Sequence, residues 1–462
     1  MGKYERLVHG VFARMFGDSV SHGGVLAAAI RSGECSRTRR KTSPGSRDSL
    51  AAPSLAIISV VAIVLAGGTT PVRAQTAADA VETTFGDHPT VTFGTIATLE
   101  GVAKFQLDWR QADEASAVES WDVHLMRVGI SGRLFKRVEY QIERQLNDDT
   151  SPWRDVYADV AVSSALQARG GKFKIPFGLD MLTSAMQLDF VYRSLAASSL
   201  APGRDVGVEI HGRLFARALR YDVGVFRHGG DNVRASERLE SDRTWAARVT
   251  VAPWQQARGS PWRDLTLGGG MTGGDLPEGL HTLDSRTVFD SPLFPKVYVN
   301  GARRRIGGDA EWRNGPFGVR GEFIHVRDTR RGEGTDDEDL PDLYSRGGYV
   351  SGTWVVTGEK KGDTVKPKRP LPRGGFGAVE VAGRIEWIGF GTEGEGDASA
   401  GPRAAHLADQ GARVVTLGIN WYLNRFVRLQ ANAIRERRPD VVGGVSGEHT
   451  SWSPVIRFQL GL

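Results

Sequence analysis

Four basic residues, Lys172, Lys174, Arg193 and Arg204, lie on and around one unusual stretch of the sequence. The stretch opens with GKFKIPFG and closes with LAPGRDVGV, as β-strands would, but its middle is apolar and lacks a two-residue alternation. Lys and Arg side chains at the narrowest point of a channel select anions. The four residues are therefore candidates for anion selection. The alternative is an ion pair with a neighbouring carboxylate, as for Arg204 beside Asp205.

Most of the chain after residue 96 alternates between apolar and polar residues. In VEYQIERQL (138–146) and DVYADVAV (155–162), aliphatic and aromatic residues alternate with charged, amide or small residues. Such alternation places successive side chains on opposite faces of a strand. Many segments of this kind, joined by Gly, Asp, Asn and Pro turns, favour an all-β sandwich or barrel.

Two features favour a transmembrane antiparallel β-barrel over a soluble sandwich with its polar face in solvent. The polar face is too charged to be a protein core, and aromatic residues near strand ends are typical of interfacial girdles. The expected girdle residues are Trp245, Trp312, Trp387, Trp421 and Tyr422. At roughly 24 residues per strand and connection, the residues after 74 predict about 16 strands. The last strand, SWSPVIRFQLGL, would turn Ile456, Phe458, Leu460 and Leu462 outward.

The N-terminal part is typical of an export signal. Residues 55–68 (LAIISVVAIVLAGG) follow several basic residues and precede TTPVRAQ. A basic region, an apolar core and small residues before a cut define a secretory signal peptide. The alternative, a membrane anchor, would need about 20 apolar residues. We expect a presequence at 1–74 with 1–30 upstream of the true start, a short segment at 75–95 and a barrel at 96–462.

Removal of the presequence changes the charge. Residues 1–74 hold ten of the 59 Lys and Arg residues and four of the 54 Asp and Glu residues, which leaves a net charge of −1. No basic excess for nucleic-acid binding remains. The single cysteine, Cys35, lies in the presequence, so neither disulfides nor cysteine metal sites are expected. The acidic run at 336–339 lacks the ligand spacing of a calcium loop and predicts a solvated loop.

Enzyme signatures are absent from the sequence. The ten histidines are scattered, and no HExxH, nucleophile elbow or phosphate-binding loop occurs. We therefore expect neither catalysis nor a cofactor or metal. A hydrolase assembled from distant strands remains an alternative, as does a non-conducting structural or adhesin-like barrel plugged by its own loops.

Several blocks of the chain resemble one family. GKFKIPFGLDMLTS, YRSLA, LAPGRDVGVEIHG, ARVTVAPW, VSGTWVVTGE, VKPKRPL, GFGAVEVAGRIEW and VTLGINWYLNRFVRL occur in the order and approximate spacing of the phosphate-selective porin O and P family. The resemblance runs from about residue 97 to the C-terminus. It implies a 16-stranded outer-membrane barrel, usually a homotrimer, in contact with membrane lipid and lipopolysaccharide. It also implies passive diffusion of small anions such as phosphate.

The segment after PFGL resembles the inward-folding constriction loop of that family. Backbone that leaves the sheet at membrane depth is tolerated where it is buried in protein or lines a water-filled cavity. An apolar insert over 177–203 can pack against the barrel wall while its polar edge narrows the pore. An extracellular loop with some helix is the alternative. Pro176 and Gly178 would end the preceding strand, and Pro202 and Gly203 would start the next one by a turn.

The expected lumen carries both signs of charge. With aliphatic residues facing lipid, alternation sends Lys172, Lys174, Arg220, Arg248, Arg320, Arg384, Arg428 and Arg457 to the lumen, together with eight carboxylates. The resemblance adds Arg127 and places Arg193 and Arg204 at motif positions. AMQLD contains no cation, however, and His124 and Leu125 stand where two arginines are common in the family. We therefore expect a modest preference for anions rather than strict phosphate selectivity.

The mature chain is predicted to begin at or near Gln75. Signal peptidase should cut after Ala74, because small residues follow the apolar core at that point. N-terminal sequencing of protein extracted from outer membranes checks this. Recovery of that protein with residues 1–74 intact would contradict it.

Overall fold

The computed structural model describes residues 81–85, 88–111, 120–230, 243–281, 287–288, 296–371, 374–394, 401–407, 410–442 and 445–462. These residues belong to one compact unit, Thr70–Leu462. The predicted presequence, 1–74, lies outside the described residues.

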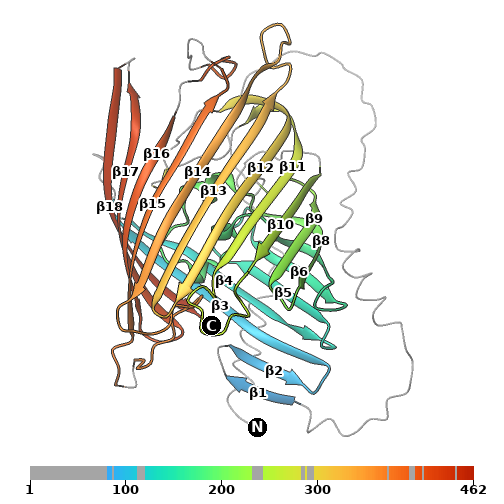
Figure 1. Ribbon diagram of the computed structural model, residues 1–462, viewed down its shortest axis with the longest axis vertical. Helices are drawn as coiled ribbons and strands as arrows, with labels where there is room; N and C mark the ends of the chain where they lie inside the picture. Colours follow the sequence, from blue (N-terminus) through green and yellow to red (C-terminus); the bar gives the residue numbers. More distant parts are fainter. Residues whose placement is uncertain are drawn as a thin grey trace, which may run out of the picture. The chain divides into compact units, whose positions relative to one another are not determined.

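The described residues form a closed antiparallel barrel of sixteen strands, β3 to β18 (Figure 1). Each strand pairs with the next in the sequence, and β18 pairs with β3 through Ile456 opposite Trp109. The predicted barrel and its strand number are confirmed. The strands are β3 (Ala97–Arg110), β4 (Ser120–Leu134), β5 (Val138–Gln145), β6 (Trp153–Ala161), β7 (Gln167–Lys174), β8 (Arg204–Leu214), β9 (Leu219–Phe226), β10 (Thr244–Val251), β11 (Thr266–His281), β12 (Val297–Asn314), β13 (Phe317–Arg330), β14 (Leu340–Val355), β15 (Ala378–Thr392), β16 (Gln410–Tyr422), β17 (Val427–Val442) and β18 (Val445–Gly461).

A small hairpin extends the sheet before the barrel. Strand β1 (Val81–Phe85) pairs with β2 (Pro89–Phe93), and Thr90–Phe93 of β2 pair with Ala97–Glu100 of β3. No helix of the described residues is long and apolar enough to cross a membrane.

The two faces of the sheet divide by polarity as the alternation predicts. Val208 and Ile456 on the outer face are 62% and 47% exposed, whereas Asp159 and Glu209 on the inner face are 3% and 2% exposed. Apolar side chains therefore meet lipid, and carboxylates meet the lumen.

The girdle prediction is wrong for one aromatic residue. Trp421 stacks on Phe376 at the outer surface, with ring centroids 5.0 Å apart, but Tyr422 is buried and its hydroxyl lies 3.5 Å from the Glu380 carboxylate. Neighbouring residues of a strand point to opposite faces, so Trp421 and Tyr422 cannot both meet lipid.

The strands differ in length around the barrel. Strands β5 to β10 have 8 to 11 residues, whereas β11 to β18 have 13 to 18. One wall is therefore much shorter than the other.

The connections distinguish the two ends of the barrel. Residues 135–137, 315–316 and 423–426 form short turns at one end, although the connections between β10 and β11 and between β14 and β15 at that end are longer. The other end carries the connection between β7 and β8 and that between β13 and β14, 331–339. Outer-membrane barrels have short periplasmic turns and longer extracellular loops. The end from which the insert leaves β7 is therefore extracellular.

A charge on the outer face should destabilise the barrel according to its depth. Val208 lies in the middle of β8, and Leu214 ends the strand on the same face. Val208→Arg should lower the free energy of unfolding by about 2–4 kcal/mol, and Leu214→Arg by about 0–1 kcal/mol. Heat-dependent gel mobility and urea titration in vesicles measure both. An equal loss from both variants would show that β8 does not face lipid in this way.

Candidate constriction site

The segment between β7 and β8 folds into the barrel. It contains α3 (Leu179–Leu182), η2 (Ala185–Gln187) and α4 (Leu195–Leu200). Its residues Phe177, Val191 and Leu200 are buried in one apolar cluster with inward side chains of the long wall, including Ile324 and Ile388. The apolar middle of the insert therefore packs against the inner wall, as the sequence predicts.

Carboxylates of the wall accept hydrogen bonds from the backbone amides at the starts of α3 and α4. The amides of Leu179 and Asp180 donate to the Glu322 carboxylate, with N···O distances of 2.9 and 3.1 Å. The Leu195 amide donates to Glu386 at 2.6 Å. Free amides at a helix start favour a negative charge. The sequence predicts these two carboxylates in the lumen but not their contact with the insert.

Gly178 allows the first of these contacts. Its φ is 74°, a conformation that favours glycine, and a Cβ atom there would lie 2.4 Å from a carboxylate oxygen of Glu322. The bend that turns the chain into the lumen therefore requires a residue without a side chain.

Arginine and amide side chains of the wall hold the backbone of the middle of the insert. Arg457 donates to the Val191 carbonyl at 2.6 Å, and the Val191 amide donates to Asn432 at 2.8 Å. Arg384 donates to the Tyr192 carbonyl at 3.0 Å. Arg428, Gln430, Gln459 and Asn420 make similar bonds to carbonyls between residues 186 and 189. The predicted lumen cations Arg384, Arg428 and Arg457 therefore position the insert.

One buried ion pair joins the insert to the periplasmic end. Lys361, from the connection between β14 and β15, donates to Asp189 at 2.5 Å and to Glu380 at 2.7 Å. Burial alone would lower the pKa of Lys361, but the neighbouring Asp189, Tyr422 and Glu380 raise it above its usual value. The lysine is therefore held in its charged form.

Two of the predicted pore cations lie at the end of α3. The Lys174 ammonium donates to the carbonyls of Met181, Leu182 and Thr183 at 2.7, 3.1 and 2.8 Å. Arg193 donates to the Thr183 carbonyl at 2.7 Å and also to that of Asp180. Cations are favourable beside the free carbonyls of a helix end.

Arg204 forms an ion pair, as the alternative interpretation predicts, but its partner is not the expected Asp205. It holds Asp155 of β6 through two bonds of 3.0 and 2.8 Å. Asp205, the sequence neighbour, accepts instead from the His228 amide at 2.8 Å.

The predicted lumen position of Lys172 is wrong. Lys172 lies opposite Val156 and Val206 in the two neighbouring strands, and directly opposite residues share a face. Phe173 instead faces inward, where it packs against Phe226 with ring centroids 5.4 Å apart. The Lys172 ammonium contacts the Ser151 hydroxyl at 3.0 Å, near the extracellular strand ends. Alternation failed here because an apolar residue occupies the inner face.

The remaining predicted lumen cations each meet a carboxylate. Arg220 pairs with Asp222 at 2.6 Å and Arg248 with Asp309 at 2.7 Å. Arg320 pairs with Glu311 at 2.5 Å, and Arg127 with Glu143 at 3.1 Å.

The sequence interpretation missed Lys104 and Arg154, which lie near the insert cations. Lys104 shares the Glu143 carboxylate with Arg127, and Arg154 pairs with Asp148 at 2.6 Å. The alternation KFQLDW in β3 could have revealed Lys104, because Gln106 and Asp108 on the same face are buried. Arg154 is the second residue of β6 and lies beside an irregular register, so alternation does not predict its hydrogen bond to the inward Gln145.

Together these residues form a basic cluster beside the insert. We define it as seven cations on β3 to β8 and the insert, within electrostatic range of four carboxylates. The cations are Lys104, Arg127, Arg154, Lys172, Lys174, Arg193 and Arg204, and the carboxylates are Glu143, Asp148, Asp155 and Asp205. Cations outnumber carboxylates in the cluster, and they still do so when Lys172, which lies on the outer face, is left out.

Removal of the Lys361 charge should loosen the insert. Lys361→Met leaves the buried Glu380 without its cation and Asp189 with only the more distant Arg320 at 3.8 Å, which should cost about 3–5 kcal/mol of unfolding free energy. Lys360→Met is the matched control, because its side chain is 72% exposed and its surface pair is worth about 0–1 kcal/mol. Urea titration and the noise of single-channel current measure the effect. Equal stability of both variants would show that the pair does not anchor the insert.

Comparisons with known proteins agree with this geometry. Residues 101–270 and 285–459 match the family "Phosphate-selective porin O and P". Porin O of Pseudomonas aeruginosa is 23% identical over 379 residues, which cover 72% of this chain and 80% of that protein. The fold is similar to an anion-selective porin from Comamonas acidovorans (TM-score 0.50, 11% identity, 79% of this chain and 100% of that one). It is also similar to the outer membrane channel DcaP of Acinetobacter baumannii (TM-score 0.51, 9% identity, 79% and 97%). The chain belongs to the phosphate-selective porin O and P family.

Proposed function

We propose that this protein is a non-enzymatic outer-membrane porin through which small hydrophilic solutes diffuse passively, with a modest preference for anions. Family membership and the closed barrel support the pore. The observation that carries the preference is the basic cluster beside the insert. Anion selectivity in channels depends on such cations at the constriction.

The position of the insert determines which side of the lumen conducts. Its backbone is bonded to the long wall through Glu322, Glu386 and Asn432. Solutes therefore pass along its other side, next to the cations of the short wall. Charges at a narrow passage act over its whole cross-section, whereas those in a wide vestibule are screened within about 8 Å at physiological salt.

Several observations favour a modest preference over strict phosphate selectivity. The cluster cations are engaged with carboxylates or backbone carbonyls, so their hydrogen-bond donors are shared with the protein. A relative described as anion-selective has the same fold, which supports anions as a class. Phosphate itself remains the narrower proposal.

A non-conducting barrel is the second candidate, since the many bonds between insert and wall would also suit a plug. Single-channel recording in a planar bilayer distinguishes the two. Stepwise conductance supports the porin, and its absence from folded protein supports the plug. We further propose export through the cleaved signal peptide and assembly as a homotrimer, for which cross-linking in native outer membranes provides the test.

Selectivity should depend on the basic cluster rather than on the total lumen charge. Lys104→Gln removes one cluster cation while Arg127 still neutralises Glu143. A unit charge about 8 Å from a solute in water attracts an anion and repels a cation by about 0.5 kcal/mol each, so at low salt the anion-to-cation permeability ratio should fall about fivefold. Arg220→Gln is the control, because Arg220 is a lumen cation paired with Asp222 away from the cluster.

The reversal potential across a salt gradient measures both variants, and added phosphate shows whether the preference extends to that ion. Equal shifts from Lys104→Gln and Arg220→Gln would contradict the proposal, because they would mean that every lumen charge contributes alike.

A further inference from the structure

The outer face of the long wall carries a row of arginines where lipid is expected. Strands β12, β14, β16 and β17 turn Arg304, Arg346, Arg413, Arg435 and Arg437 outward in their extracellular halves. We call these five residues the outer basic belt. The lipid-facing band of an outer-membrane barrel is apolar, and a charge in it is costly. Arg346 and Arg413 of this belt therefore favour an anionic partner.

The strand register gives the belt an apolar lower border. Trp387 lies opposite Arg413, which lies opposite Arg437. One pair closer to the membrane centre, Ile385 lies opposite Val415. Directly opposite residues share one face of the sheet. The arginines thus begin in the row of the last aliphatic residues, where Arg435 lies opposite Val415, and they extend from there toward the extracellular lipid headgroups.

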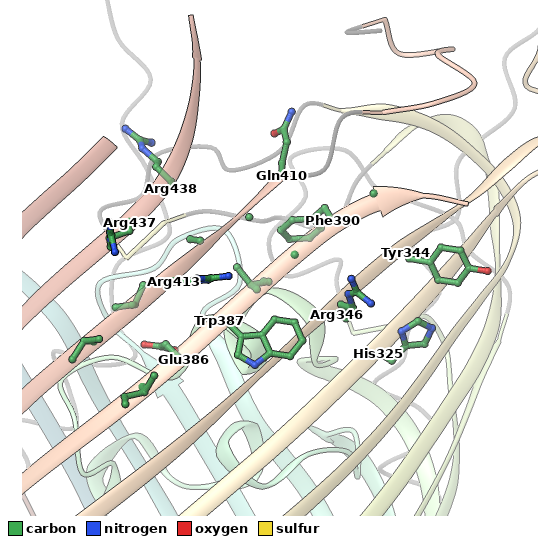
Figure 2. A pocket seen from close by; sticks show the side chains of 18 of the residues that line it. His325, Tyr344, Arg346, Glu386, Trp387, Phe390, Gln410, Arg413, Arg437 and Arg438 are labelled. Carbon is green, nitrogen blue, oxygen red and sulfur yellow. The ribbon is translucent and has the colours of Figure 1, made fainter. Parts of the chain in front are cut away.

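Two glycines hollow the wall inside the belt. Arg346 lies opposite Gly389, and Gly389 lies opposite Gly411. A Cβ atom at Gly389 would meet only the Gln410 carbonyl, at 3.8 Å, so the space above it is open. The resulting hollow has a volume of about 1380 Å³ and is lined by Arg346, Arg413, Trp387 and their neighbours (Figure 2).

The charges around the hollow are mostly positive. Figure 2 shows Arg346 and Arg413 above the Trp387 ring, with Arg437 farther along the same wall. The two carboxylates among the lining residues have other partners. Glu386 pairs with Arg384 at 2.9 Å, and Glu393 lies 4.0 Å from Arg327. Arg435 lies over the Trp452 ring, 5.7 Å from its centroid.

A ligand for this hollow must be anionic at one end and apolar at the other. Arginine forks bind phosphate oxygens through strong charged hydrogen bonds. The apolar border formed by Trp387, Ile385 and Val415 continues into the lipid-facing band. A free anion would use only the first feature, and an uncharged lipid only the second.

We propose that this hollow binds the phosphorylated headgroup of an outer-leaflet glycolipid, the lipid A portion of lipopolysaccharide. Its phosphates contact Arg346 and Arg413, and its acyl chains lie along Trp387, Ile385 and Val415. The site is on the lipid-facing side of the wall, so it is independent of the conducting path.

The test measures retention of lipid A by the purified full chain in detergent, using native mass spectrometry. Bis-phosphorylated lipid A should bind, and lipid A without phosphates should not. The double variant Arg346→Ser with Arg413→Ser should bind about 100-fold more weakly, since each lost charged hydrogen bond corresponds to roughly tenfold. Arg144→Ser is the matched control, because Arg144 is an exposed, outward arginine at the extracellular end of the short wall. It should change binding less than about twofold.

A second variant tests whether the shape of the hollow contributes to lipid A binding in addition to the arginine charges. Gly389→Leu fills the open space and keeps every arginine, and it should weaken binding about tenfold. Unchanged heat-dependent mobility and conductance verify that each variant is folded. Equal binding by wild type and either belt variant would overturn the proposal. Displacement of lipid A by inorganic phosphate, with no contribution from the acyl chains, would overturn it in favour of a free-anion site.

Discussion

The structure depends on the cost of an unpaired peptide group at membrane depth. The chain leaves the sheet after Lys174 and returns at Arg204, and every stretch of backbone between them needs partners where little water is present. The wall supplies them from side chains: Glu322 and Glu386 accept from amides, while Arg457 and Arg384 donate to carbonyls. The main role of these charged lumen side chains is therefore to bind the protein's own insert.

Because the lumen cations bond to the insert, a lumen with many cations need not bind anions tightly. Arg193 and Lys174 donate hydrogen bonds to the carbonyls at the end of α3, and the Arg204 guanidinium donates to the Asp155 carboxylate. Their positive charge still acts on a passing ion, but their hydrogen-bond geometry is fixed by the protein. These cations therefore attract a passing anion through their charge, but they do not offer it free hydrogen-bond donors for direct binding.

The sequence predicts the barrel well because the face of a strand residue depends on a strictly local rule. Outward Val208 and Ile456 and inward Glu322 and Glu386 all follow from alternation. The polar-inward pattern failed for Lys172, because the apolar Phe173 faces inward and packs against Ile175 and Phe226. For Tyr422 alternation holds, and the girdle prediction was wrong because the ring is buried with Val355, Val365 and Ala378. Partners such as Asp189 and Lys361 are 172 residues apart, and no local pattern connects them.

The short wall has a consequence for the surrounding bilayer. An eight-residue strand such as β9 is about 27 Å long, and a tilt of about 40° reduces its height to about 20 Å. The apolar band of such barrels is about 25 Å tall, so hydrocarbon of ordinary thickness does not match this wall. Lipid must thin beside β5 to β10, or another protein surface must replace it there, whereas the long wall needs neither adjustment.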